Sequence, residues 1–206
     1  HQLRTPLAAL RAQADYALRE PDPVRMRQAL QALSAALDNA VRATNQLLAL
    51  ARSDAAAVQP EPFDAGELAR EAALAQLAQA RERGIDLGVD APEVCRASGD
   101  RALLGQALAN LLHNAIHHGR AQGVVTVQAA SDALGCSLAV LDDGPGVDAA
   151  LLQRLGQRFA KGRASSGSGL GLAIAESVMA RHGGRLRVEP RDDGPGLKAV
   201  LWWPHA

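Results

Sequence analysis

The stretch that most constrains the fold runs from Gly99 to Gly119 and is predicted to be one helix. Its apolar residues recur at steps of three and four, which is typical of a helix with one buried face. They are Leu103, Leu104, Ala107, Leu108, Leu111, Leu112, Ala115 and Ile116. Asp100 stands where an N-cap residue is expected, and Gly119 stands where a C′ glycine would end the helix.

The interior of this helix contains two asparagines, Asn110 and Asn114. Residues four apart lie on one helix face, and asparagine is a poor helix former. Two solvated amides are the simplest interpretation of the pair. A site for the phosphates of a nucleotide is the alternative, and the motifs that follow in the chain favour it.

Two glycine motifs follow this helix. The apolar strand Ser137–Leu141 runs into the segment Asp142–Gly146, DDGPG, and Gly167–Leu172, GSGLGL, opens a second helical run. A single glycine-rich loop is weak evidence for a site. Here an asparagine-bearing helix, a strand that ends in D-x-G-x-G, and a G-x-G-x-G segment before a helix stand in a fixed order.

In this order the motifs resemble the catalytic, ATP-binding domain of sensor histidine kinases. That domain has the Bergerat (GHKL) ATPase fold, an α/β sandwich that gyrase, Hsp90 and MutL also use. The asparagine pair resembles the N box of the family, Asp142–Gly146 the G1 box, Phe159 the F box and Gly167–Gly171 the G2 box. The nucleotide-binding residues that the resemblance implies are Asn110, Asn114, His117, Asp142, Gly144, Gly146, Phe159, Lys161, Gly167, Gly169, Leu170 and Gly171.

Each part of ATP has a candidate partner among these residues. Asp142 can accept a hydrogen bond from the adenine amino group, which guanine does not offer at that position. Asn114 can give its amide oxygen to Mg²⁺, which prefers oxygen ligands, and Asn110 can orient it. The G2 glycines allow backbone N–H groups to approach an anion. Lys161 can offer charge from the lid, as can Arg163, although solvated lid charges are as good an interpretation.

His117 follows Asn114 by one turn, where the family often has a lysine or arginine that faces the phosphates. A histidine there predicts that ATP binds more tightly at pH 6 than at pH 8. His113 and His117 also have the spacing of two zinc ligands. No third ligand is visible nearby, so a zinc site is the weaker interpretation.

The N-terminal region, residues 1–52, is predicted to be a helical hairpin. One heptad seam comprises Leu3, Leu7, Leu10, Ala14 and Ala17. Pro21-Asp22-Pro23 interrupts the pattern, and a second seam runs through Val24–Arg52. A hairpin cannot cover its own apolar stripe. A second copy would complete a four-helix bundle, and we therefore expect a homodimer.

The first seven residues, HQLRTPL, closely resemble the H box of the same family. The resemblance implies that His1 is the phosphoacceptor and that Thr5 orients a water for the phosphatase reaction. The family usually has an acidic residue after the histidine, whereas this chain has Gln2. An amide can fix the imidazole tautomer, but it cannot take up a proton near pH 7.

Residues 53–62 lose the heptads and gain prolines, which indicates a linker before a catalytic domain over 63–206. In that domain we expect a helix over 65–83, strands near 85–89, 94–97, 124–130, 136–141, 185–189 and 197–203, and a helix over 170–182. A second DDGPG copy begins at Asp192 and is predicted to be a hairpin turn without a binding role. The region 143–168, with a short helix around 149–159, is where the ATP lid of the family falls.

Composition excludes several other classes of protein. Lys and Arg number 22, and so do Asp and Glu, which does not indicate a nucleic-acid surface. Aromatic residues make up 2% of the chain, too few for base-stacking platforms. Cys95 and Cys136 lack paired-thiolate spacing and are expected to be buried thiols in a reducing compartment. The sequence has no apolar run long enough to cross a membrane.

The sequence thus predicts a protein-histidine kinase that uses ATP and Mg²⁺, phosphorylates His1, passes the phosphoryl group to an aspartate of a response regulator and dephosphorylates that regulator. The expected partners are a second copy and a receiver domain, with no nucleic acid. The resemblance implies a cytoplasmic fragment of a bacterial inner-membrane protein whose sensor lies upstream of His1. One alternative is a nucleotide-binding dimerising module without kinase activity, because of Gln2. A gyrase- or MutL-like ATPase that acts on DNA is disfavoured by the neutral charge and the H box.

Overall fold

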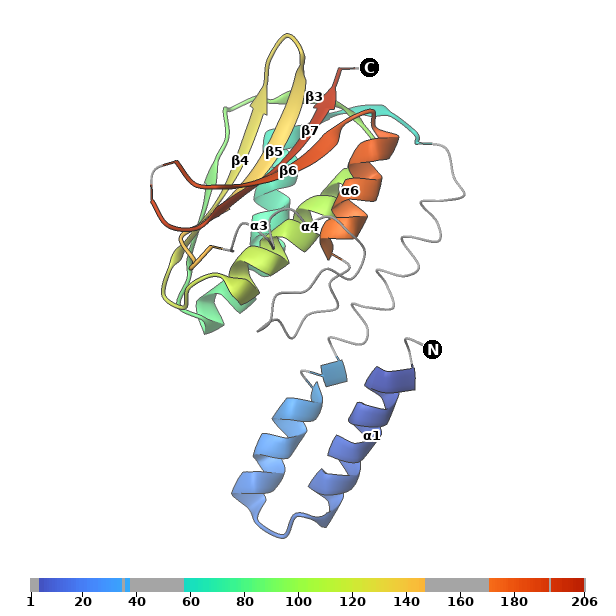
Figure 1. Ribbon diagram of the computed structural model, residues 1–206, viewed down its shortest axis with the longest axis vertical. Coiled ribbons are helices and arrows are strands. Elements are labelled where there is room, and N and C mark those ends of the chain that lie inside the picture. The colour runs from blue at the N-terminus through green and yellow to red at the C-terminus, as the bar shows by residue number, and fades with distance from the viewer. Residues whose placement is uncertain (1–3, 35, 38–57, 147–170, 193, 206) are drawn as a thin grey trace. The chain divides into compact units, whose positions relative to one another are not determined.

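The computed structural model describes residues 4–34, 36–37, 58–146, 171–192 and 194–205. Contacts divide the chain into two units, His1–Arg52 and Ser53–Ala206. The first unit is helical, and the second combines helices with β-sheet (Figure 1). This division gives the helical hairpin and the α/β unit that the sequence predicts.

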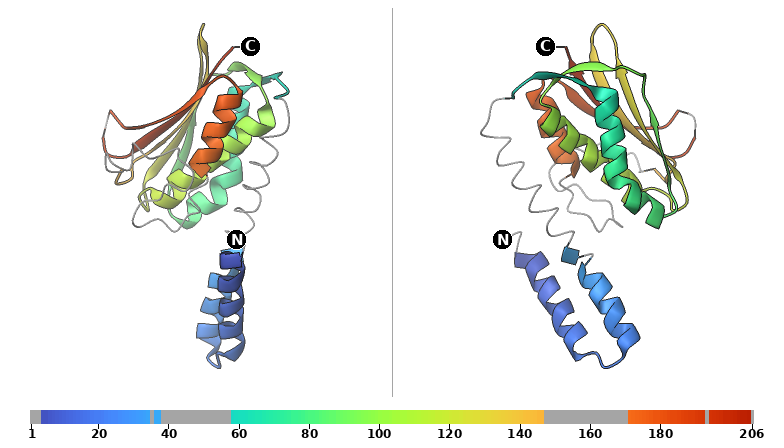
Figure 2. Two further views of the ribbon diagram at one scale, coloured as in Figure 1. Left: turned by 45° about the vertical axis from the view of Figure 1, so that its right-hand side comes forward. Right: turned by 180° about the vertical axis from the view of Figure 1, so that it is seen from behind.

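The helical unit is an antiparallel hairpin. Its first helix is α1 (Arg4–Arg19), and residues 23–34 and 36–37 are helical again, side by side with α1 in both figures (Figures 1 and 2). The predicted break at Pro21–Pro23 is confirmed. Asp22 begins the second helix, because its carboxylate accepts a hydrogen bond from the Val24 N–H at 2.9 Å and lies 3.7 Å from the Arg25 Nε.

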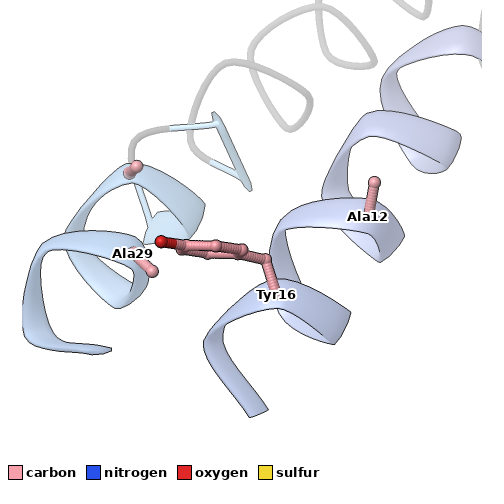
Figure 3. Close-up of a pocket in the computed structure, with 4 residues that line it drawn as sticks. Ala12, Tyr16 and Ala29 are labelled. Atoms are coloured by element: carbon pink, nitrogen blue, oxygen red, sulfur yellow. The ribbon is translucent and has the colours of Figure 1, made fainter. Parts of the chain in front are cut away.

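One face of this hairpin is apolar and exposed. A groove of about 300 Å³ is lined by Ala12 and Tyr16 of α1 and by Ala29 and Ala32 of the second helix. The Tyr16 ring extends from α1 toward the second helix, as Figure 3 shows. Leu30 and Leu37, which lie within the predicted second seam region Val24–Arg52, are 50% and 53% exposed. The described part of the hairpin therefore leaves much of its apolar stripe uncovered.

The second unit is built on a five-stranded sheet in the order β2-β4-β5-β7-β6. Its strands are β2 (Asp86–Asp90), β4 (Val124–Ser131), β5 (Gly135–Asp142), β6 (Arg185–Pro190) and β7 (Leu197–Pro204). β2 pairs with β4 in parallel, and the other pairs are antiparallel. The helices α3 (Ala65–Glu82), α4 (Arg101–His118) and α6 (Gly171–Arg181) cover one face of this sheet (Figure 2). These elements follow the predicted order.

The core lies between α4 and the sheet. The apolar face predicted for α4 is buried, with Leu104, Leu108, Leu112 and Ile116 all fully covered. The sheet contributes a matching row of side chains. These are Val125, Val127, Leu138, Leu201 and Trp203. Asp100 is the N-cap of α4, as predicted, and its side chain accepts a hydrogen bond from the Leu103 N–H at 3.0 Å.

A small second sheet was not predicted. β1 (Glu61–Asp64) pairs antiparallel with β3 (Arg96–Gly99), so the stretch interpreted as a linker over 53–62 ends inside a strand. Phe63 of β1 stacks on Trp203 with ring centroids 6.5 Å apart, and the Trp203 Nε1–H donates to the Ser98 carbonyl at 2.8 Å. These tertiary contacts join the small sheet to the large one.

Asp64 ends β1 and caps α3. Its Oδ1 accepts a hydrogen bond from the Glu67 N–H at 2.9 Å, and its Oδ2 accepts one from the Cys95 N–H at 3.2 Å. The Glu67 hydrogen bond is the largest of the effects that hold the pKa of the Asp64 carboxyl below its ordinary value. Cys95 and Cys136 are free, buried thiols, as expected.

Candidate nucleotide-binding site

The asparagine face of α4 lies against the beginning of α6. A Cβ atom placed on Gly171 would lie 3.5 Å from Asn114 Nδ2 and 3.6 Å from Asn110 Cβ. The last glycine of the predicted G2 box therefore contacts the predicted N box. The first N–H groups of a helix carry a partial positive charge and have no partner within the helix, so this corner suits an anion.

His117 lies one turn further along α4 and stacks on His113, with ring centroids 4.1 Å apart. Both side chains are half-buried, whereas the neighbouring His118 is exposed. The described residues contain no group of three or more His, Cys, Asp or Glu that could hold a metal ion. The described part of the chain thus gives no support to the zinc interpretation.

The predicted G1 turn begins where β5 ends, at Asp142. The Asp142 Oδ1 accepts a hydrogen bond from the Gly144 N–H at 2.9 Å. Burial raises the pKa of the Asp142 carboxyl above its ordinary value, and the N–H groups of Gly144 and Leu197 partly offset this rise. A half-buried carboxylate with unused acceptor capacity is suited to read an amino group of a ligand.

The G1 turn also contacts the end of α4. A Cβ atom on Gly119 would lie 3.7 Å from the Asp142 Cβ, and one on Gly144 would lie 2.9 Å from the Gly119 Cα. Gly119 ends α4 as predicted, but its φ of −68° and ψ of 177° are extended and not the left-handed conformation of a C′ glycine. A glycine stands there because a side chain would collide with the Ala115 carbonyl. The G1 turn thus meets α4 at the C-terminal end of the helix, beyond the asparagines.

The two aspartates of the G1 turn have different contacts. Asp143 is bound to β4, since its Oδ1 accepts a hydrogen bond from the Val124 N–H at 2.9 Å and its N–H donates to the Val124 carbonyl at 3.3 Å. Asp142 faces the end of α4 instead. This difference is consistent with Asp142, rather than Asp143, as the residue that reads a base.

The second DDGPG copy forms the connection between β6 and β7, as predicted. Its place next to the first copy was not predicted. A Cβ atom on Gly146 would lie 3.7 Å from the Gly196 carbonyl oxygen, and Gly196 directly contacts the backbone of Asp142. Arg191 directly precedes this second copy, and its positive charge lowers the pKa of Asp142. The sequence analysis did not identify Arg191 as a site residue. The repeated motif was a visible signal, but only strand register shows that the two copies meet.

Several predicted site residues lie outside the described part of the chain. They are His1, Gln2, Phe159, Lys161, Gly167, Gly169 and Leu170, together with the short helix expected around 149–159. Thr5 belongs to α1, of which only the backbone is described at that point. The described site consequently consists of the asparagine face, the beginning of α6 and the G1 turn.

These residues fit a magnesium nucleotide. Mg²⁺ takes oxygen ligands and keeps several waters, so one protein amide beside phosphate oxygens is a sufficient donor set. Asn114 supplies such an amide, and the missing side chain at Gly171 leaves the space beside it open. The half-buried Asp142 lies beyond the other end of this helix face, at a suitable place for the base.

Two family models match the chain. The model described as "Histidine kinase-, DNA gyrase B-, and HSP90-like ATPase" matches residues 99–206. The model described as "His Kinase A (phospho-acceptor) domain" matches residues 1–56. The first match lies in the second unit, and the second match covers the helical unit. None of the helices that the structure describes has the length and apolar character that a membrane crossing requires.

Individual relatives agree with the family models. Sensor protein QseC of Salmonella typhi is 35% identical over 98% of this chain, which spans 45% of that protein. The crystal structure of full-length ShkA in complex with AMPPNP has a TM-score of 0.73 and 28% identity, over 100% of this chain and 44% of that one. Histidine kinase ThkA in complex with response regulator protein TrrA has a TM-score of 0.77 over 100% of this chain and 59% of that one. At 20% identity, the ThkA match shows the fold alone.

Proposed function

The chain belongs to the sensor histidine kinases of two-component systems, and from this premise we propose that it moves the γ-phosphoryl group of ATP to His1 and then to an aspartate of a response regulator. The chain spans less than half the length of the QseC relative. One observation carries the proposal. The asparagine face of α4 contacts the beginning of α6 at Gly171, and the end of the same helix contacts the G1 turn.

Binding of ATP would use both ends of this helix face. Asp142 would accept a hydrogen bond from the adenine amino group, and Asn114 would hold Mg²⁺ with Asn110 as its support. The beginning of α6 at Gly171 would face the phosphates, and His117 would add positive charge when it is protonated. Mg²⁺, when bound, neutralises charge on the phosphate oxygens during the transfer.

The transfer itself depends chiefly on positioning. The Nε2 lone pair of His1 would form the new bond to phosphorus as the bond between phosphorus and the bridging oxygen of ADP breaks. Gln2 would accept a hydrogen bond from the imidazole and so hold the tautomer with a free Nε2. The proton that the phosphorylated imidazole loses would go to solvent, because an amide cannot take it.

The helical hairpin would provide the dimer and the surface for the regulator. A second copy would cover the groove at Ala12, Tyr16, Ala29 and Ala32 in a four-helix bundle. A receiver domain would then dock on the bundle. Thr5 of α1 would orient a water that hydrolyses the acyl phosphate of the regulator.

Gln2 favours a second candidate function. If the family's acidic residue is indispensable, this chain would bind ATP as a conformational signal in a dimer and transfer nothing. The two candidates differ only in the chemical step, because both use the same nucleotide site.

Incubation with γ-labelled ATP separates the candidates. The kinase should acquire acid-labile, base-stable label that a His1→Gln variant does not acquire, and Gln2→Glu should keep or raise the rate. ATP binding without label in the parent, with label restored in Gln2→Glu, would support the second candidate. A protein that ignores adenine nucleotides would contradict both.

A further inference from the structure

The connection between β6 and β7 begins at Arg191 and ends at Gly196, and Gly196 lies against the G1 turn. Asp142, the last residue of β5, is opposite Leu197, the first residue of β7. The Arg191 N–H donates to the Gly196 carbonyl at 3.3 Å, and this hydrogen bond closes the connection. The same Gly196 carbonyl is the atom that a side chain on Gly146 would contact. The end of the connection is therefore a neighbour of both ends of the G1 turn, Asp142 and Gly146.

Gly196 is required at this contact for two independent reasons. Its φ of +119° is one that residues with a side chain rarely adopt. A Cβ atom there would also overlap the Asp142 carbonyl and would lie 3.0 Å from the Asp143 Cα. Gly196 is buried, so the collision could not be relieved toward solvent. A side chain at position 196 would push the connection away from Asp142.

Two groups from this side act on the Asp142 carboxyl. The Leu197 N–H lowers its pKa, and the positive charge of Arg191 lowers it further. The charged group in the G1 turn itself, Asp143, acts in the opposite direction. The other described elements at this point contribute Gly119 after α4 and Val125 of β4, which are uncharged, and the charged Arg120 and Lys198, which are not among the groups that shift the Asp142 pKa. Arg191 is therefore the described positive charge that favours the ionised form of Asp142.

We propose that the β6–β7 connection is a positioning element for base recognition: Gly196 allows it to approach Asp142, and Arg191 and the Leu197 N–H hold that carboxylate ready for the amino group of an adenine. This inference rests on the proposed nucleotide site, which it deepens by assigning two positioning residues, Arg191 and Gly196. It also gives the second DDGPG copy a role, although the sequence predicts only a turn.

The first test compares two ligands that differ by one amino group. ATP and the triphosphate of unsubstituted purine riboside are titrated against the parent, Gly196→Ala and the control Gly88→Ala. Gly88 lies in edge strand β2, and a Cβ atom there would have no neighbour within 4 Å. The parent and the control should prefer ATP by about tenfold or more, the worth of one hydrogen bond to a charged group. Gly196→Ala should lose most of this preference and bind the purine analogue as the parent does.

The second test uses Arg191 and does not depend on a backbone change. The pH at which ATP binding falls on the acid side should move upward in Arg191→Gln and should stay near the parental value in Arg191→Lys. If Arg191 has only a structural role, its substitution would lower the affinity for both ligands at all pH values. Far-ultraviolet circular dichroism would show whether each variant is folded, and if Gly196→Ala is not, the Arg191 pair decides.

The outcomes separate this inference from the proposed function. A parent that prefers ATP, with unchanged preference in Gly196→Ala and an unchanged pH profile in Arg191→Gln, overturns the inference and leaves the nucleotide site standing. A parent that binds both ligands equally overturns base reading by Asp142 and this inference with it. A parent that binds neither ligand overturns the proposed function as well.

Discussion

Gly119 and Gly144 approach so closely that a Cβ atom on Gly144 would lie 2.9 Å from the Gly119 Cα. This contact joins the end of α4, which carries the asparagines, to the turn that carries Asp142. The distance between the two halves of the nucleotide site is thereby set by two residues without side chains. The contact is between backbone atoms, which cannot move aside as the end of a flexible side chain can. It is therefore sensitive to substitution.

Gly144→Ala should therefore separate the two halves. The added Cβ would also lie 2.7 Å from the Asp142 Oδ1, the atom that the Gly144 N–H now binds. We expect a loss of about 1–3 kcal/mol in the free energy of unfolding, the usual cost of overpacking, together with loss of ATP binding. Urea denaturation and nucleotide titration measure the two effects, and Gly88→Ala is the control. Unchanged ATP binding would show that the contact does not set the site.

The raised pKa of Asp142 predicts opposite effects on stability and binding. In the folded protein the Asp142 carboxyl holds its proton to a higher pH than in the unfolded chain. The free energy of unfolding should therefore fall as the pH rises from the ordinary aspartate pKa through the raised pKa of the folded state. Asp142→Asn removes that cost and should raise the melting temperature of the ligand-free protein at neutral pH. It should also weaken ATP binding at least tenfold, because the amide offers a poorer acceptor than a carboxylate. A variant that binds ATP as the parent does would contradict the role of Asp142.

His117 should make the affinity for ATP depend on pH between pH 6 and pH 8. ATP should bind more tightly at pH 6 than at pH 8, since imidazole gains a positive charge over this interval. His117→Lys keeps the charge throughout and should flatten the difference between the two pH values. His118→Lys is the matched control, because His118 is adjacent and exposed. If the parental affinity is already equal at pH 6 and pH 8, His117 does not act on the phosphates.

Asp64→Ala should destabilise the catalytic unit. The N-cap is lost, and the Cys95 N–H loses its partner as well, so we expect a cost of about 1–2 kcal/mol. Because the folded pKa of Asp64 is lowered, its contribution is present above the ordinary aspartate pKa and is lost as the pH falls through the lowered value. Urea denaturation between neutral and acid pH measures this, with the exposed Asp86→Ala as control. An equal loss in both variants would argue against a capping role.

Thr5→Ala should separate two activities of the hairpin. The variant should phosphorylate itself at the parental rate, because the attacking atom belongs to His1. It should lose dephosphorylation of the regulator, for which a hydroxyl at Thr5 would position water. Release of inorganic phosphate from a phosphorylated receiver domain, together with the labelling rate, distinguishes the cases. Loss of both activities would indicate that the substitution damages the hairpin instead.

The elements that could be predicted are those whose sequence pattern is local. The periodicity of α4, its cap at Asp100 and the strand that ends at Asp142 all follow from residues close together in the chain, and each is confirmed. The family resemblance, and not spacing, assigned the two asparagines and Gly171 to one nucleotide site. The structure adds the distances that join them.

The features that were missed depend on residues far apart in the chain. β1 has four residues, one of them Pro62, and gives no alternating pattern; it is a strand because β3 pairs with it and Trp203 stacks on Phe63. Gly119 carries no local sign that distinguishes a left-handed turn from a close backbone contact. The meeting of the two DDGPG copies depends on the register between β5 and β7, which places Asp142 opposite Leu197.

Both tryptophans of the chain, Trp202 and Trp203, lie on β7. Trp203 is almost completely buried, at 1% exposure. The Arg185 guanidinium lies over the Trp202 ring, 4.7 Å from its centroid. Intrinsic tryptophan fluorescence is consequently a spectroscopic report on the catalytic unit, to which the helical hairpin adds no tryptophan signal. A melting curve followed by fluorescence and one followed by helical ellipticity would diverge whenever the two units unfold at different temperatures.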